Sequence, residues 1–177
     1  VLVALTLLMG LPACSVLPKS EPVDVYLMPE LSPRPRAPQP AVPWSLRVSL
    51  PAGSTHLASQ RILVVAQAQR VSAYHGAKWS DPAPWLLRNR MLDAFRLDGR
   101  VNALSSDDKV LQADFVLVTE LRAFQSEYRA GVPEVVIRLD ARLVQSDTRR
   151  IVASRHFDVR QAAPGAALPE VVQAFGQ

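Results

Sequence analysis

The sequence has few of the residue types that build catalytic and metal centres. Its 177 residues include one cysteine and three histidines, which are His56, His75 and His156. The histidines lie far apart in the sequence and none is spaced from another as metal ligands are, so we expect no metal site and no cofactor. No glycine-rich phosphate loop is present, and no serine or cysteine sits in a recognisable nucleophile motif. We therefore do not expect an enzyme.

Acidic pairs are also scarce. The one acidic doublet, Asp107-Asp108, is assigned to capping or to solvent rather than to acid–base chemistry.

The sequence has no apolar run long enough for a membrane-spanning helix. The first ten residues, VLVALTLLMG, carry no charge. A membrane-spanning helix needs roughly 20 apolar residues, whereas the apolar core of a signal peptide needs only about 7–15. The start of the chain is therefore typical of a signal peptide.

The single cysteine follows this apolar stretch at once. Leu11, Pro12 and Ala13 precede Cys14, which places Leu11 at −3 and Ala13 at −1 as in a lipobox. Residues 1–13 are thus predicted to be a lipoprotein signal peptide whose cationic first part is missing, and Cys14 is the predicted lipidation site. The other interpretation is a buried structural thiol, but the polar, proline-rich chain after Cys14 does not resemble a core. A lone cysteine also cannot form an internal disulfide.

The predicted lipid sets the expected location of the protein. Two or more acyl chains make attachment to a membrane stable, because each buried methylene contributes roughly 0.8 kcal/mol. Ser15, rather than aspartate, at the next position favours sorting to the outer membrane over the inner one. We expect a protein of the cell envelope that is lipid-anchored in the periplasm.

Residues 14–43 are predicted to be a tether that contains a first strand. Proline fixes φ and removes an amide donor, so a proline-dense segment favours an extended spacer. Within the segment, Val23–Leu27 alternates enough to form a strand at a sheet edge. The prolines after the lipobox are Pro18, Pro22, Pro29, Pro33, Pro35, Pro38, Pro40 and Pro43.

Residues 44–177 are predicted to form one domain, which suits a chain of this length. Its first half should contain strands at 44–50, 61–66 and 70–74, with Gly76 closing the last. A helix should follow, with Asp81 as its N-cap, Pro82 as its first residue and Gly99 as its stop. Leucines and aromatic residues widen its apolar stripe, and its wet side should carry Arg88, Arg90 and Arg96.

The second half of the domain indicates three antiparallel strands. Residues 113–124, 134–144 and 151–159 alternate between apolar and polar side chains, which is typical of strands with one solvated face. Residues 131–133 and 147–150 are the predicted turns. A last amphipathic helix should begin at Leu168 and run through Phe175, and we expect the natural helix to be longer than the part present here.

The distribution of charge and the aromatic side chains indicate which partners the protein could bind. The net charge of +4 is spread along the chain with no basic cluster, so we do not expect nucleic acid as a partner. Tyr74, Trp79 and Trp85 are candidate partner-binding residues, because aromatic anchors concentrate binding energy. The other interpretation is that Trp79 packs over the first turn of the helix and that Asp81 caps it.

A series of short motifs occurs in one order along nearly the whole chain. They are the lipobox, Val25-Tyr26-Leu27, Arg61-Ile62, Trp79-Ser80-Asp81-Pro82, Asp114-Phe115-Val116-Leu117, Leu121-Arg122-Ala123-Phe124, 135–143, Ser154-Arg155-His156-Phe157 and Val171-Val172-Gln173-Ala174-Phe175. This order resembles that of the ABC-type transport auxiliary lipoproteins, the PqiC-like family that accompanies MCE-type lipid transport systems. The sequence departs from the family where its usual Trp-Ala-Asp appears as Trp79-Ser80-Asp81, and its final helix is cut short.

The resemblance implies a fold and a function. The fold is a single α/β domain with a mixed, mainly antiparallel sheet flanked by helices, which we expect to form a three-layer sandwich. The implied partner is the MCE-domain protein of a lipid ABC transporter. The implied function is to dock on that complex and support envelope integrity, with no reaction of its own.

Two further hypotheses stay open. The chain could instead be a lipid- or small-molecule-binding periplasmic lipoprotein with its own apolar pocket. It could also form a homo-oligomer, because tethered partners of ring-shaped transporters often share the symmetry of the ring.

Overall fold

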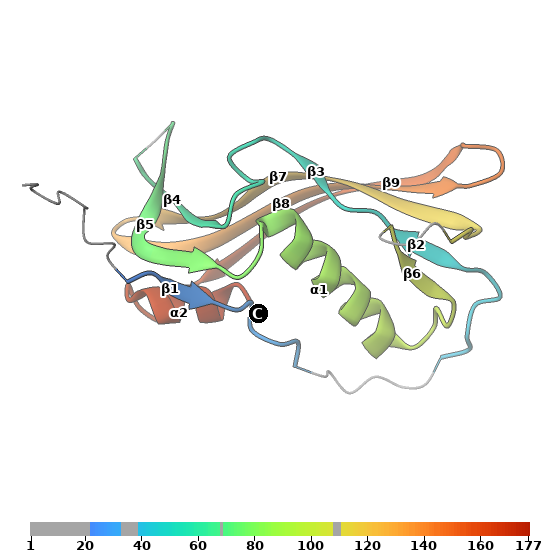
Figure 1. The fold of residues 1–177 in the computed structure, drawn as a ribbon, viewed down its shortest axis with the longest axis horizontal. Coiled ribbons are helices and arrows are strands. Elements are labelled where there is room, and N and C mark those ends of the chain that lie inside the picture. The colour runs from blue at the N-terminus through green and yellow to red at the C-terminus, as the bar shows by residue number, and fades with distance from the viewer. Residues whose placement is uncertain (1–21, 33–38, 68, 108–110) are drawn as a thin grey trace, which may run out of the picture.

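The structure, a computed structural model, describes residues 22–32, 39–67, 69–107 and 111–177. In these ranges the chain forms nine strands, all in one sheet, and two helices (Figure 1). The described residues are thus a single α/β domain made mostly of strand. The elements are β1 (Asp24–Tyr26), β2 (Leu46–Val48), β3 (Ala52–Gly53), β4 (Arg61–Gln67), β5 (Arg70–Trp79), α1 (Ala83–Asp98), β6 (Leu104–Ser106), β7 (Phe115–Arg129), β8 (Val132–Gln145), β9 (Ile151–Ala162) and α2 (Leu168–Ala174).

Strand β7 organises the sheet. On one side it pairs antiparallel with β8 along its whole length, and β8 pairs antiparallel with β9. On its other side it pairs in parallel with three short strands in turn, β2, β3 and β4. Beyond these lie β6, which pairs with β2, and β5, which pairs with β4 and β1. The expected mixed sheet is confirmed, and β1, β6 and β9 form its edges.

The predicted strands are confirmed, with different lengths. The first predicted strand is β1, and it lies at an edge as expected. The strand predicted at 44–50 shrinks to β2, whereas the three strands of the second half, predicted to end at 124, 144 and 159, end at Arg129, Gln145 and Ala162. The strand predicted at 70–74 continues as far as Trp79. Gly76 does not end the strand. It has a φ of +66° and lies where the pairing of β4 with β5 is irregular, and β5 continues beyond this irregularity.

A β-bulge in β7 changes which residues face the core. Leu121 pairs with Leu139, but the next pair is Ala123 with Arg138, so Arg122 is the extra residue. Before the bulge the odd-numbered residues from Phe115 to Leu121 face inward, as the alternation predicts. After it the phase shifts by one residue, and Phe124 packs into the core.

The hairpin between β7 and β8 turns earlier than predicted. The turn expected at 131–133 lies at Ala130-Gly131, because Arg129 pairs directly with Val132. Both turn residues have positive φ, 51° and 82°, as a two-residue type I′ turn requires. Val132 is thus already part of β8, and the prediction for this turn is wrong by one residue.

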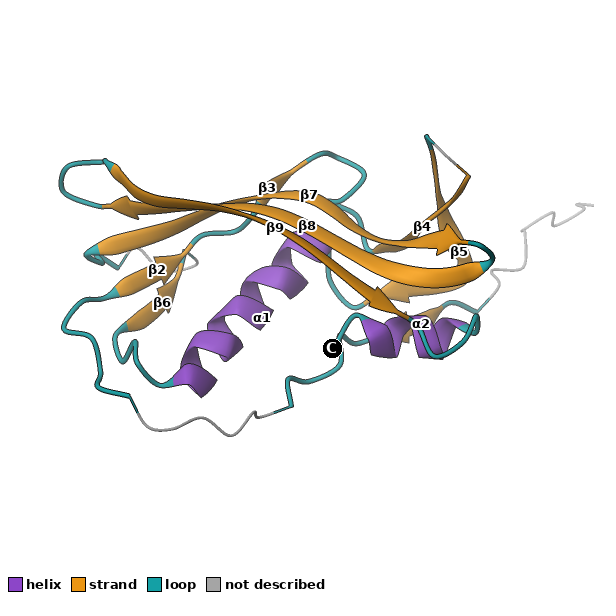
Figure 2. Ribbon diagram, turned by 180° about the vertical axis from the view of Figure 1, so that it is seen from behind, coloured by secondary structure: helices purple, strands orange, loops and turns teal. Residues whose placement is uncertain are grey.

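Both helices cover the same face of the sheet. Figures 1 and 2, which view the molecule from opposite sides, place α1 and α2 below the long β7–β8–β9 strands. Side chains of both helices join one buried cluster with Leu121, Phe124 and Leu139 of the sheet. The described elements therefore form two layers, and the expected three-layer sandwich is not seen.

Helix α1 begins differently from the prediction. Pro82 is itself the N-cap residue, with φ −57° and ψ 145°, and no side chain caps the helix. The prediction that Asp81 caps the helix is therefore wrong. The first turn needs little capping, because the Trp85 amide donates to the Pro82 carbonyl at 2.9 Å and Pro84 has no amide to satisfy.

The end of α1 agrees with the prediction, but its wet face does not. Gly99 has φ +73° and its amide donates to the Phe95 carbonyl at 3.1 Å, so it ends the helix as expected. Of the three arginines expected in solvent, only Arg96 is well exposed. Arg90 is half-buried and Arg88 is buried, with 4% of its surface exposed.

Helix α2 confirms the last predicted helix, over Leu168–Ala174. The Glu170 carboxylate accepts a hydrogen bond from the Ala167 amide at 3.1 Å, which ties down the first turn. Two turns of helix have little stability alone, so the packing of Val171, Val172 and Phe175 into the core holds α2 in place. The expected longer natural helix stays a prediction.

Candidate functional site

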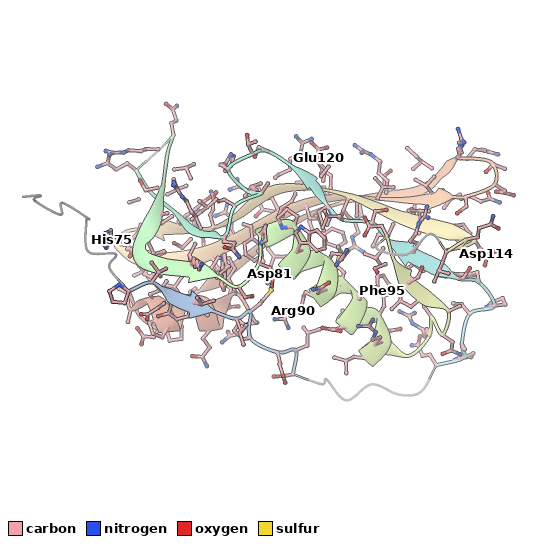
Figure 3. All side chains as sticks on the ribbon, viewed as in Figure 1. His75, Asp81, Arg90, Phe95, Asp114 and Glu120 are labelled. Carbon is pink, nitrogen blue, oxygen red and sulfur yellow. The ribbon has the colours of Figure 1, made fainter. Side chains whose placement is uncertain are left out.

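The three histidines do not come together in the fold. His56 lies in a turn where its Nε2 is 3.3 Å from the Ser54 hydroxyl, and His156 on β9 pairs through Nδ1 with the Asp140 carboxylate at 2.7 Å. His75 lies on β5, and Figure 3 shows it far from Asp114. Among the described residues, no group of three histidine, cysteine or acidic side chains could hold a metal ion.

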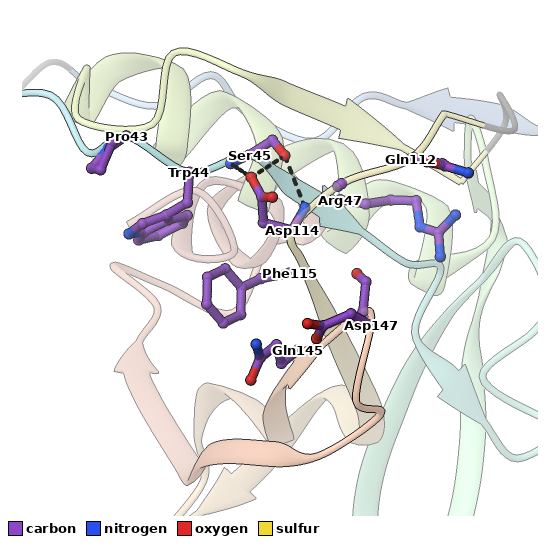
Figure 4. Close-up of a pocket in the computed structure, with 11 residues that line it drawn as sticks. Pro43, Trp44, Ser45, Arg47, Gln112, Asp114, Phe115, Gln145 and Asp147 are labelled. Carbon is purple, nitrogen blue, oxygen red and sulfur yellow. Dashed lines mark hydrogen bonds between the residues drawn. The ribbon is translucent and has the colours of Figure 1, made fainter.

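One cavity, of about 740 Å³, lies where β2, β7 and the β8–β9 loop meet (Figure 4). Trp44 and Phe115 line it in an edge-to-face contact with ring centroids 5.3 Å apart. Beside them the Asp114 carboxylate accepts hydrogen bonds from the amide and the hydroxyl of Ser45, each at 2.7 Å. The Asp114 amide donates back to the Ser45 hydroxyl at 2.9 Å.

The hydrogen bonds of Asp114 in this cavity fit a structural role for its carboxylate. The hydrogen bonds from the amide and hydroxyl of Ser45 hold the pKa of Asp114 below its usual range, so the carboxyl stays ionised near neutral pH. A carboxylate that is already engaged by fixed donors is a poor general base. We therefore assign Asp114 to joining the start of β7 to β2.

A second cavity is an apolar groove between α1 and the inward face of β7, β8 and β9. Its volume is about 680 Å³. One wall is the side of α1 that carries Met91 and Phe95, and Figure 3 labels Phe95 on this helix. The floor and far wall come from the strands, through Leu117, Ile137, Leu139, Ala141, Leu143, Ala153, Phe157 and Val159. Solvent-accessible apolar surface of this kind is characteristic of a binding surface.

Charged groups line parts of the groove. The Arg155 guanidinium lies over the Phe157 ring, 5.2 Å from its centroid, and has no carboxylate partner within the described part of the chain. Arg100 and Asp98 form an ion pair with each other. The groove therefore has an apolar interior and one guanidinium, that of Arg155, that pairs with no described carboxylate.

The buried Arg88 was not predicted from the sequence. Its Nη1 donates to Oδ1 of Asp107 at 3.0 Å, and its guanidinium carbon lies 4.6 Å from the centre of the Trp85 ring. The other oxygen of Asp107 accepts the Leu50 amide at 2.7 Å. Burial alone would raise the pKa of Asp107, but the Leu50 amide and Arg88 outweigh it and hold the pKa low. Asp107 is thus a structural link rather than the predicted helix cap or solvated group; Asp108 lies outside the described residues.

The outward face of the long strands carries a row of ion pairs. His156 of β9 contacts Asp140 of β8, which also accepts from Arg122 of β7 at 3.0 Å. Further along, Arg138 contacts Asp158 at 3.3 Å. The hydrogen bonds from His156 and Arg122 lower the pKa of Asp140. Such exposed pairs contribute little stability each, but they show that acidic and basic groups alternate across the three strands.

The three predicted partner-binding aromatic residues do not form one surface. Trp79 is completely buried, in edge-to-face contact with Phe124 and Phe175 at 6.0 and 5.1 Å between centroids. Tyr74 is half-buried, and its hydroxyl lies 3.0 Å from that of Ser126. Burial raises the pKa of Tyr74. Trp85 is 41% exposed. These positions favour the packing interpretation for Trp79, and the role of Trp85 in partner binding stays a prediction.

Cys14 and the lipobox lie outside the described residues. No helix in the described part of the chain is long and apolar enough to cross a membrane.

Comparison with known proteins decides the family. The sequence model of the ABC-type transport auxiliary lipoprotein component matches residues 26–177. The chain belongs to this family. The proteins of this family are auxiliary lipoproteins of ABC-type transport systems and are not an enzyme family, so membership also implies a lipid-anchored place in the cell envelope. No curated protein sequence matches the chain.

Solved structures agree with the family assignment. A crystal structure of a protein from Xanthomonas campestris is 31% identical, with a TM-score of 0.80, over 88% of this chain and 87% of that chain. A crystal structure of an uncharacterised protein shares the fold at 17% identity and a TM-score of 0.67, over 89% of this chain and 91% of that one. A dodecamer of PelC from Paraburkholderia phytofirmans is more distant, at 14% identity and a TM-score of 0.47, over 78% of this chain and 86% of that one.

Proposed function

We propose that this auxiliary lipoprotein is anchored in the periplasm by acyl chains on Cys14 and docks on the MCE-domain subunit of a lipid ABC transporter. The family match over residues 26–177 carries the proposal, because it covers the folded domain from the last residue of β1 onward. The lipobox that ends at Cys14 supplies the anchor, and Ser15 favours the outer membrane. By holding one side of the transport system, the protein supports the integrity of the envelope.

The chemistry of the described side chains supports a docking role rather than a reaction. Asp107 and Asp114 are each engaged by fixed hydrogen-bond donors, and His156 is paired with Asp140 on the outward face. Trp85 is the most exposed of the three predicted aromatic contacts, and we assign it to the docking surface.

Purification from native membranes tests this function. The full chain, tagged at its C-terminus, is extracted with mild detergent, and the proteins that accompany it are identified. We expect an MCE-domain subunit and its ABC transporter. A Cys14→Ser variant is the control, and we expect it to leave the membrane fraction and lose these partners. A membrane-bound chain that retains no transporter subunit would contradict the docking role.

The apolar groove favours a second candidate function, the binding of a lipid. Its volume of about 680 Å³ and its interior of leucine, isoleucine, methionine and phenylalanine side chains suit an acyl chain. Native mass spectrometry of the chain purified from membranes would reveal one retained lipid beyond the anchor. An Ala141→Trp variant, which fills the groove, should release that lipid and keep the fold. Protein without retained lipid would remove this candidate.

A further inference from the structure

Strand β9 is a long edge strand, and no other strand of the described residues pairs with its outer side. It pairs with β8 alone in the described sheet, and all but one of its twelve residues are exposed. The other two edges, β1 and β6, have only three residues each. A long unpaired edge offers a row of free backbone donors and acceptors, which proteins normally cover or interrupt.

The side chains of β9 do little to block pairing. The strand contains no proline, and its only pairing irregularity with β8 lies near its start, between Leu143 and Val144 of β8. Its apolar residues remain open to solvent, with Val152 50%, Phe157 38% and Val159 52% exposed. Its outward face carries an imidazole, a carboxylate and a guanidinium in succession, from His156, Asp158 and Arg160. An edge of this kind is suited to a second strand of complementary pattern.

We propose that β9 pairs antiparallel with β9 of a second copy of this chain, about a two-fold axis that passes through Phe157 perpendicular to the sheet. The sheet then continues from one molecule into the next. In this register Phe157 faces Phe157 of the second copy on the groove side. On the outward side His156 faces Asp158 of the second copy, and Asp158 faces His156.

The pairing of polar side chains selects this register over its neighbours. Moving the axis to His156 sets two imidazoles opposite each other, moving it to Asp158 opposes two carboxylates, and moving it to Arg155 opposes two guanidinium groups. An axis at Val159 places Asp158 opposite Arg160, but it pairs only residues 156–162, whereas an axis at Phe157 pairs 152–162. The register at Phe157 therefore combines the longest overlap with an imidazole and a carboxylate that can form a hydrogen bond.

The pairing also extends interactions that each chain already makes. Asp140 holds His156 at 2.7 Å, and Arg138 holds Asp158 at 3.3 Å, on the outward face of one chain. A contact between His156 and Asp158 of the second copy would join the two rows of ion pairs across the axis. On the inward face, β9 contributes exposed apolar surface to the groove of each molecule. Contact between the two Phe157 rings would cover part of that surface.

Cysteine cross-linking tests both the partner and the register. The full chain with Cys14→Ser has no thiol, so a single introduced cysteine reports on its own position. Phe157→Cys places two thiols on directly opposite residues, within the range of a disulfide. We expect mild oxidation to convert most of this variant into a covalent dimer on a non-reducing gel.

Matched variants on the same face of β9 fix the register. Ala153→Cys should give little dimer, because two Ala153 positions would lie about 27 Å apart along the strands. The double variant Ala153→Cys with Gln161→Cys should regain the dimer, since these residues face each other. Light scattering of the Cys14→Ser chain with no change in β9 should give twice the mass of one chain.

Three results would overturn the proposal. One is a monomer at high concentration with no disulfide at position 157, and another is cross-linking that is equally strong for Phe157→Cys and Ala153→Cys. The third is a larger assembly whose cross-links avoid β9. Because the tests use protein without acyl chains and without a transporter, their outcome is independent of whether the lipidated chain docks on one.

Discussion

The buried guanidinium of Arg88 donates to the carboxylate of Asp107 at 3.0 Å, and this contact joins α1 to the segment that follows β6. Asp107 also accepts the Leu50 amide, so it connects three segments that are distant in sequence. Asp107→Ala should lower the free energy of unfolding by about 1–3 kcal/mol, because a buried charge loses a partner. Urea unfolding followed by circular dichroism measures the change.

A control for this prediction lies on the same helix. Asp93 pairs with Arg96 at 2.7 Å, but both side chains are more than half exposed. Asp93→Ala should therefore cost less than about 0.5 kcal/mol. Equal decreases in the free energy of unfolding for the two substitutions would mean that the Arg88–Asp107 contact stabilises the fold no more than an exposed ion pair does.

The low pKa of Asp107 predicts how stability changes with pH. The folded pKa is depressed, so the ionised group stabilises the fold above its unfolded pKa of about 3.9, and this contribution is lost as pH falls through the folded value. Asp114 and Asp140 shift in the same direction. The free energy of unfolding should thus decrease when the pH drops below about 4. The difference in this free energy between Asp107→Asn and the unsubstituted chain should be smaller at pH 3 than at pH 7. Urea midpoints at these two pH values give the comparison; an unchanged gap would refute it.

The two tryptophans near the start of α1 should behave differently. Trp79→Ala removes a completely buried ring and should destabilise the domain by about 3–5 kcal/mol. Trp85→Ala removes a partly exposed ring stacked on Arg88 and should cost no more than about 1 kcal/mol. Thermal melts measure both, and Trp79→Phe offers a milder version. A Trp79→Ala protein that melts normally but no longer binds the transporter would restore the surface-patch interpretation.

The β7–β8 turn offers a stabilising substitution. Ala130 has a φ of 51°, which costs an L-residue other than asparagine or glycine about 1 kcal/mol. Ala130→Asn should therefore raise the free energy of unfolding by about 0.5–1 kcal/mol. Gly131→Ala should lower it by about 1 kcal/mol through backbone strain alone, since a Cβ there meets no atom within 4 Å. Opposite signs in denaturant titrations support the turn; a loss of stability in Ala130→Asn contradicts it.

The sequence predicted the parts of the fold that repeat with a fixed period. Residues 137–143 alternate without interruption because one face of β8 is covered and the other carries the ion pairs. The end of α1 was equally clear, because Gly99 can adopt positive φ at no steric cost. The I′ turn was missed because Ala130-Gly131 lacks the asparagine that usually marks such turns.

The site depended on contacts that no local pattern encodes. Arg88 is buried because Asp107, nineteen residues later, is brought against α1 by the chain around β6. The groove depends on the spacing between α1 and β9, which belong to opposite halves of the sequence. Trp79 looked like a possible surface anchor because its burial relies on Phe175, almost a hundred residues away.

Mass analysis of residue 14 is the most direct test of the account. The mature protein, taken from membranes of its native host, should begin at this residue and carry the added mass of its acyl chains. A mature chain that keeps an unmodified thiol there and stays in the soluble fraction would contradict the proposed anchor, and with it the docking function at the membrane.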